Sequence, residues 1–194
     1  MKNQHKILPV VILMAVGAFA RLIPHIPNFT PLEGLTIFGA AYLGRNYIAI
    51  ILPLLLIYIS DFIINNTTAR EYFTNNEGIV WFSNYMIFNI ISLILIVLIS
   101  RKLLKTVNFK SILFSALAAS IIFFLISNFG ALFSPTSPYS KDVSGLLASY
   151  MAGIPFFRTS LLSNLFFTAI IFGSYNIILS LFYSKSLELN AREE

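Results

Sequence analysis

The sequence predicts an all-α integral membrane protein, a six-helix transmembrane bundle that forms a single domain over residues 1–194. Of its 194 residues, 57% are hydrophobic and only 11% are charged, and the mean hydropathy is +0.81. Soluble domains carry about 25% charged residues and seldom contain long apolar runs. The runs themselves are the second observation, because several reach the roughly 20 residues with which a helix crosses a bilayer.

Six apolar stretches fit this pattern, at residues 7–23, 32–44, 47–64, 81–99, 111–133 and 159–183. The last four have the required length. The second is short, so it spans only if its flanks dip into protein or if it is a tilted, re-entrant piece. A further apolar stretch, 145–154, is too short to span and is followed by a proline. We expect it to form a separate helix that lies on the outer surface and covers the mouth of the bundle.

The basic residues predict a plasma (inner) membrane protein with both termini in the cytoplasm. With the N-terminus inside, nine of the 13 lysines and arginines fall in cytoplasmic pieces and four outside, as the positive-inside rule requires. The inner ones are Lys2, Lys6, Arg45, Arg101, Lys102, Lys105, Lys110, Lys185 and Arg192, and the outer ones are Arg21, Arg70, Lys141 and Arg158. Since this charge is scattered through short loops, no nucleic-acid partner is expected.

One alternative concerns the first stretch. Lys2 and Lys6, an apolar run and then Ala18-Phe19-Ala20 also fit a cleavable signal peptide. Against this, Arg21 would directly follow the cut, the apolar run continues beyond it, and five spans would remain.

Residues 21–31 contain three prolines within eight residues, at Pro24, Pro27 and Pro31. Each proline lacks an N–H and restricts the residue before it, so the segment should be a stiff, extended loop. This loop carries Arg21, His25 and Asn28. It is either a rigid connector or the preorganised wall of a binding site.

Polar residues gather near the outer end of the apolar stretches, together with Glu33 in the adjoining loop. Because polar groups in lipid are costly, their placement at one level predicts a shared cavity. The candidate substrate-binding residues are Arg21, His25, Asn28, Asp61, Asn84, Asn128, Arg158 and Asn164, with Trp81 at the rim. Two alternatives remain open. Asp61 forms either an ion pair with Arg21 or Arg158 or a ligand contact, and the stripe of Ser160, Asn164 and Thr168 serves either a ligand or helix packing.

Two parts of the sequence resemble those of a known protein family. The first comprises Ala20 to Pro31 and Phe38 to Leu43, and the second comprises Ala148 to Arg158 with Leu162, Asn164 and Phe167. Through them the chain resembles a family of uncharacterised bacterial membrane proteins that are described as transport proteins. That family is grouped with the S components, the substrate-binding subunits, of energy-coupling-factor (ECF) vitamin transporters.

The resemblance implies a six-helix protein with an outward pocket closed by the first loops. It also implies a transmembrane coupling subunit, driven by two cytoplasmic ATPases, as partner. The chain has no phosphate-binding loop of its own. S components often dock through an A-x-x-x-A pattern on the first helix. Here Ala15 is followed four residues later by Phe19, where the pattern has its second alanine. Gly17 and Ala18 offer an alternative small face.

An intramembrane enzyme is not expected, because the chain has only His5 and His25 and neither H-E-x-x-H nor G-x-S-x-G. No cofactor or metal is expected, and the absence of cysteine excludes thiolate sites. A scaffold protein of the envelope is the alternative, in which the polar residues serve only helix packing. For a binding protein, the charged candidates favour an anionic or zwitterionic small molecule.

Overall fold

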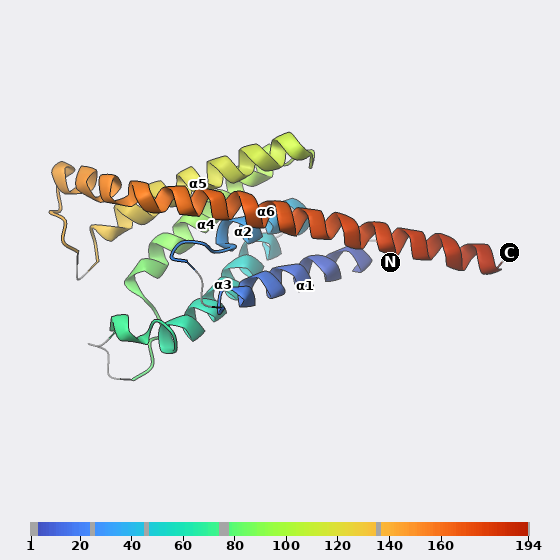
Figure 1. Ribbon diagram of the computed structural model, residues 1–194, viewed down its shortest axis with the longest axis horizontal. Coiled ribbons are helices and arrows are strands. Elements are labelled where there is room, and N and C mark those ends of the chain that lie inside the picture. Colours follow the sequence, from blue (N-terminus) through green and yellow to red (C-terminus); the bar gives the residue numbers. More distant parts are fainter. Residues whose placement is uncertain (1–3, 24–25, 45–46, 74–77, 135–136, 194) are drawn as a thin grey trace.

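The computed structural model describes residues 4–23, 26–44, 47–73, 78–134 and 137–193, and for residues 4–6, 84–85 and 183–193 it describes the backbone alone. Within these residues the fold is all-helical, as predicted, with no strand (Figure 1). The elements are α1 (Gln4–Ala20), α2 (Leu32–Tyr42), α3 (Ile48–Asn66), the 3-10 helix η1 (Arg70–Phe73), α4 (Asn84–Leu103), α5 (Phe109–Ala131) and α6 (Val143–Glu193).

The helices have the length and surface of a membrane protein. Four of them, α3, α4, α5 and α6, are long and apolar enough to cross a bilayer, and α1 is apolar but shorter. Their outer faces expose large apolar side chains, including Ile51, Leu98, Ile121 and Leu162, which are 45–65% exposed. In water such a surface would drive association, whereas in lipid it is the expected outer face. These observations support the predicted membrane class.

The second helix, α2, lies inside the bundle. Every residue from Pro31 to Ala40 is buried, and α2 contacts all five other α-helices. Its 11 residues rise only about 16 Å, half of a bilayer core. Gly34 and Gly39 allow the close packing, because an added Cβ would lie 3.1 Å from Oγ1 of Thr168 and 3.0 Å from Cγ of Pro53. The helix is therefore too short to cross the bilayer core unaided, and the other helices enclose it.

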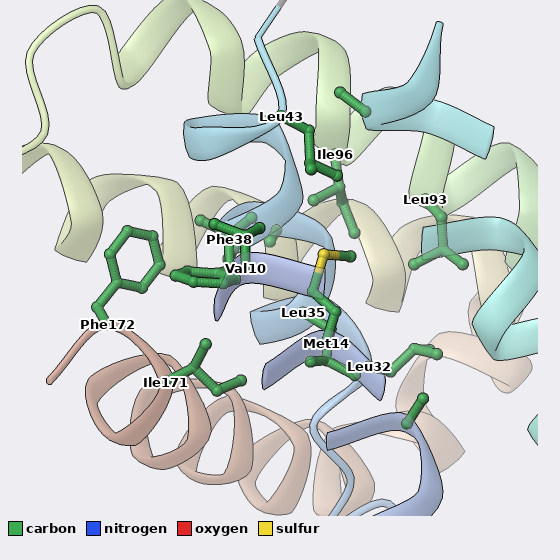
Figure 2. Packing of buried hydrophobic residues seen from close by; sticks show 14 of the residues in the cluster. Val10, Met14, Leu32, Leu35, Phe38, Leu43, Leu93, Ile96, Ile171 and Phe172 are labelled. Atoms are coloured by element: carbon green, nitrogen blue, oxygen red, sulfur yellow. The ribbon is translucent and has the colours of Figure 1, made fainter. Parts of the chain in front are cut away.

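The hydrophobic core forms around α2. Figure 2 shows Met14 of α1 beside Leu35 of α2, with Phe172 of α6 directed toward the same cluster. Phe38 is fully buried, and its ring lies 5.2 Å from that of Phe172 in an edge-to-face arrangement. Aromatic pairs of this geometry add about 0.5–1.5 kcal/mol beyond the burial of their area. The core therefore fixes α2 against both terminal helices.

The prediction of a separate surface helix at 145–154 is wrong. Residues 145–154 and the stretch 159–183 are parts of one helix, α6, which continues through Pro155. The segment packs along α5, where Ser149 Oγ donates to the carbonyl of Asn128 at 2.8 Å and Tyr150 donates to that of Leu125 at 3.0 Å. Proline is tolerated within membrane helices because neighbouring groups compensate for the bond it removes. A proline alone was therefore not enough to end the helix.

The small face expected on α1 points inward. A Cβ on Gly17 would lie 2.6 Å from Cδ2 of Leu35, and Ala18 is 1% exposed. The outward residues of α1 are large and apolar, with Ile12 52% exposed and Val16 63% exposed. Gly17 and Ala18 therefore serve the packing of α1 on α2.

The chain termini lie toward the same side of the molecule as the turn between α4 and α5 (Figure 1). The connections that follow α3 and α5 lie at the opposite end of the long axis. We call this opposite end the loop end, and its described connections are residues 67–73, 78–83 and 137–142.

Candidate functional site

Arg21 and Asp61 form an ion pair that joins the loop after α1 to α3. Nη2 of Arg21 lies 2.6 Å from Oδ1 of Asp61, and Nη1 donates to Oγ of Ser60 at 2.6 Å. The Ser60 hydroxyl donates in turn to the carbonyl of Ile57, which leaves its lone pairs to the guanidinium. The two charged side chains are only 11% and 14% exposed. Of the alternatives for Asp61, its ion pair with Arg21 is the one observed.

The other end of the same loop is fastened to α6. Ser163 Oγ donates to the carbonyl of Thr30 at 2.8 Å, and the ring of Phe29 lies 5.4 Å from that of Phe167. Between the two ends, Asn28 has φ +62°, a left-handed conformation that asparagine tolerates better than most residues. With both ends held and a tight bend between them, the described part of the loop is fixed in position, as both a rigid connector and the wall of a site would require.

A polar hollow of about 230 Å³ lies between this loop, α5 and α6. Asn28 contributes from the loop, Ser127 and Asn128 from α5, and Ser160 from α6. Nδ2 of Asn128 donates to the carbonyl of Phe124 at 2.8 Å, which orients the amide. Its Oδ1 accepts no bond from any residue in the described part of the chain. The hollow therefore has an oriented acceptor and several hydroxyl groups.

The remaining wall of the hollow is aromatic and closely packed. The rings of Phe124 and Phe157 lie 4.9 Å apart, and Phe123 and Phe156 complete the lining. Gly153 permits the approach of α6 to Asn128, because a Cβ there would lie 2.3 Å from Oδ1. Sequence reasoning missed the aromatic wall and Gly153. The adjacent phenylalanine pairs were a signal, but in an apolar helix they do not differ from lipid-facing residues.

The polar stripe of α6 serves helix packing over most of its length. Asn164 is fully buried, and its Nδ2 donates to the carbonyl of Ala116 at 2.8 Å and to Oγ of Ser120 at 2.9 Å. Thr168 donates to Oδ1 of Asn164 at 3.1 Å. Ser160, two turns before Thr168, reaches the hollow. Helix packing therefore accounts for Asn164 and Thr168, whereas Ser160 lines the hollow.

The other candidate residues are not gathered into the hollow. Arg158 is exposed on α6, and Trp81 is 61% exposed with its ring 5.3 Å from Phe62. His25 lies outside the described residues, and Asn84 begins α4 without a described side chain.

The expectation of one shared cavity is wrong for the residues that the structure describes. Asn28 and Asn128 line the polar hollow, whereas Asp61 lines a separate space between α3 and α4. Asn164 is enclosed in the α5–α6 interface. Position near one membrane level could be deduced from the helix ends, but the direction in which each side chain points could not.

A comparison with protein families matches the chain to DUF6580, described as a family of unknown function, over residues 1–187. The chain belongs to this family. The comparisons with curated proteins and with solved structures found no match. Membership of DUF6580 agrees with a membrane-type helical protein and assigns no activity.

Proposed function

We propose that this chain is a substrate-capture subunit, similar to an S component, that binds a small polar metabolite from the outer face of the plasma membrane. The observation that supports this best is the polar hollow beside a loop held at both ends. Ligand sites are concave, largely preformed and mostly apolar, with a few oriented polar groups. Oδ1 of Asn128 and the hydroxyl of Ser160 would supply those groups, and the phenylalanine rings the apolar wall.

The charge of the proposed ligand differs from the one that the sequence suggested. Asp61 neutralises Arg21, and Arg158 is exposed and does not line the hollow, so no charged side chain lines it in the described residues. An ionic ligand would lose its hydration there without gaining a counter-charge. The hollow, smaller than the roughly 300 Å³ of common drug-sized sites, instead suits an uncharged polar ring compound.

The proposed orientation places the loop end outside. The termini and the α4–α5 turn share the opposite side, where the positive-inside rule puts the nine basic residues (Figure 1). Reporter fusions at Lys141 and Lys105 should therefore report opposite compartments. The same compartment for both positions would refute this orientation.

We propose that the chain is not an enzyme and does not drive its own transport. Transport would therefore need a partner protein. The proposed partner is a transmembrane coupling subunit with two cytoplasmic ATPases. Because the small residues of α1 face inward, this partner would contact the large exposed side chains Ile12 and Val16. Co-purification that Ile12→Asn and Val16→Asn abolish would support the partnership, whereas co-purification unchanged by both would contradict this docking face.

A binding experiment tests the proposal directly. Purified protein in lipid nanodiscs is incubated with a soluble metabolite extract and washed, and retained compounds are identified by mass spectrometry. Gly153→Ala should abolish retention, because the new Cβ displaces the Asn128 amide. Gly173→Ala is the matched control on the same helix, since a Cβ there meets nothing within 4 Å. No compound retained by the native protein above the level of Gly153→Ala would refute the proposal.

A scaffold protein remains the second candidate, and the buried network of Asn164, Ser120 and Thr168 favours it. Such a network gives a specific helix interface without any ligand. The same retention experiment separates the two functions.

A further inference from the structure

A second space, which we call the α3–α4 slot, lies between α3 and α4 and has a volume of about 350 Å³. Its lining runs from Ile51 to Asp61 on α3, and from Phe82, just before α4, to Leu93 on α4. Ten residues of helix rise about 15 Å, so the slot is long as well as narrow. Ile51 and Leu55 line it and are 53% and 49% exposed on the outer face, so it opens toward the bilayer.

Apart from Tyr58 and Asn89, the lining residues of the slot are apolar until Asp61, whose carboxylate lies at one end. Asp61 is the only charged residue of the lining in the described part of the chain. It accepts from Arg21 through Oδ1, and no described group bonds its Oδ2. A carboxylate oxygen can accept more than one hydrogen bond, so Asp61 keeps unused capacity at the end of an apolar space.

Aromatic rings surround the same end. The side chain of Asn66 donates to the carbonyl of Val80 at 2.9 Å and accepts from its N–H at 2.8 Å, which fixes the segment before α4 onto the end of α3. This places Phe82 with its ring 5.4 Å from that of Tyr58, and both line the slot. The faces of such rings attract cations, most strongly where water is excluded.

We propose that the α3–α4 slot binds an amphiphile with one alkyl chain in the slot and a primary ammonium head at Asp61. The chain would lie along Leu54 and Ile90, and the ammonium would donate to Oδ2 of Asp61 beside the rings of Tyr58 and Phe82. An anionic head would place a second negative charge against Asp61, and an uncharged head would make no charge-assisted hydrogen bond to Oδ2. The same head chemistry occurs in a free alkylamine and in an aminophospholipid.

The test uses the single tryptophan of the chain, Trp81, which precedes the slot residue Phe82. Dodecylammonium is titrated into native protein in nanodiscs of phosphatidylglycerol, with Trp81 emission as the readout and the ligand expressed as its mole fraction in lipid. Dodecanol is the uncharged comparison. Because a charge-assisted hydrogen bond corresponds to at least a tenfold gain in affinity, dodecylammonium should bind at least tenfold more tightly than dodecanol. Equal affinity for the two compounds would overturn the proposal, because it would show that Arg21 satisfies Asp61 completely.

Two variants separate the slot from general partitioning into lipid. Ile90→Phe fills the slot without adding a tryptophan, and Ile99→Phe is its control on the outer face of α4, at a position that is 36% exposed. Binding should weaken at least tenfold in Ile90→Phe and stay unchanged in Ile99→Phe. The double variant Arg21→Met/Asp61→Asn removes the negative charge of Asp61 without leaving the Arg21 guanidinium unpaired. In this variant dodecylammonium should bind no better than dodecanol. Unchanged amine binding in either folded variant would overturn the proposal.

The source of the ammonium is distinguished by lipid composition. If an aminophospholipid is the natural occupant, adding phosphatidylethanolamine to the nanodiscs should remove the Trp81 response to dodecylammonium. If a free alkylamine is the occupant, the response should persist. Gly153 lies in the polar hollow, so Gly153→Ala should leave the Trp81 response to dodecylammonium intact. Failure of the slot proposal and failure of the proposed capture function are therefore separate results.

Discussion

Removing one partner of the Arg21–Asp61 ion pair should destabilise the protein far more than removing both. Two unit charges 4 Å apart attract by about 4 kcal/mol at an effective dielectric constant of 20, and the 2.6 Å contact here is closer. Desolvation offsets much of this gain. The loss of one partner leaves the other buried and unpaired, which costs about 3–5 kcal/mol. Asp61→Leu and Arg21→Met should each therefore lower the free energy of unfolding by about this amount.

The double variant Arg21→Met/Asp61→Leu supplies the control. Apolar replacement of a buried pair is often close to neutral, so we expect it to lose less than about 1 kcal/mol relative to the native protein. The assay is reversible unfolding of the protein in mixed micelles by added denaturing detergent, followed by helical circular dichroism. Because the two single losses sum to at least about 6 kcal/mol and the double variant loses less than about 1, the interaction energy of the cycle should be about 5 kcal/mol or more. Additive effects of the two single variants would refute the reasoning, because they would show that each side chain finds other partners.

Three further predictions concern packing and capping. Asn164→Ala should lower the free energy of unfolding by about 1–3 kcal/mol, because it leaves the Ala116 carbonyl and the Ser120 hydroxyl without their donor; the same detergent titration measures it, and an unchanged midpoint would contradict it. Gly130→Ala should cost about 1–3 kcal/mol, because the new Cβ would lie 2.3 Å from the ring of Phe88, whereas Gly173→Ala should cost nothing or stabilise the helix. The pKa of Asp142 is lowered, first by the Gly145 N–H and then by Ser140, so its stabilising effect is present above the ordinary aspartate pKa and is lost as the pH falls through the lowered value. Melting temperature measured from pH 6 to pH 2 should therefore fall at the acid end in the native protein and fall less in Asp142→Asn, which keeps the cap; parallel curves would contradict this.

The sequence was sufficient to predict an all-helical protein with several helices long and apolar enough to cross a membrane, because long apolar runs have few structural solutions. The predicted stretch 47–64 corresponds to α3, and 111–133 corresponds to α5 within two residues at each end. The pairing of Asp61 with an arginine was one of the two alternatives that the sequence left open, because a carboxylate at membrane depth needs either a counter-charge or a ligand. Sequence reasoning could not choose between Arg21 and Arg158, because the choice depends on how the loop after α1 crosses α3.

The grouping of the site residues was harder to predict. Helical spacing places Asn128 and Asn164 on faces of their own helices, but the rotation of each helix within the bundle decides what those faces meet. Here the rotation directs Asn164 to the Ala116 carbonyl and leaves Oδ1 of Asn128 at the hollow. The continuity of α6 through Pro155 was equally hidden, since the contacts of Ser149 and Tyr150 with α5 involve residues more than 20 positions away.

The burial of α2 has a consequence for how the protein enters the membrane. A helix that reaches about half of the bilayer core cannot be inserted as a stable span by itself, and its glycines leave it little surface to offer to lipid. Its environment exists only once α4, α5 and α6 have been synthesised, because all three contact it. The set of helices that packs around α2 is therefore incomplete until α6 has been synthesised. We therefore expect chains truncated before α6 to leave α2 without part of its packing surface and to be degraded faster than the full chain.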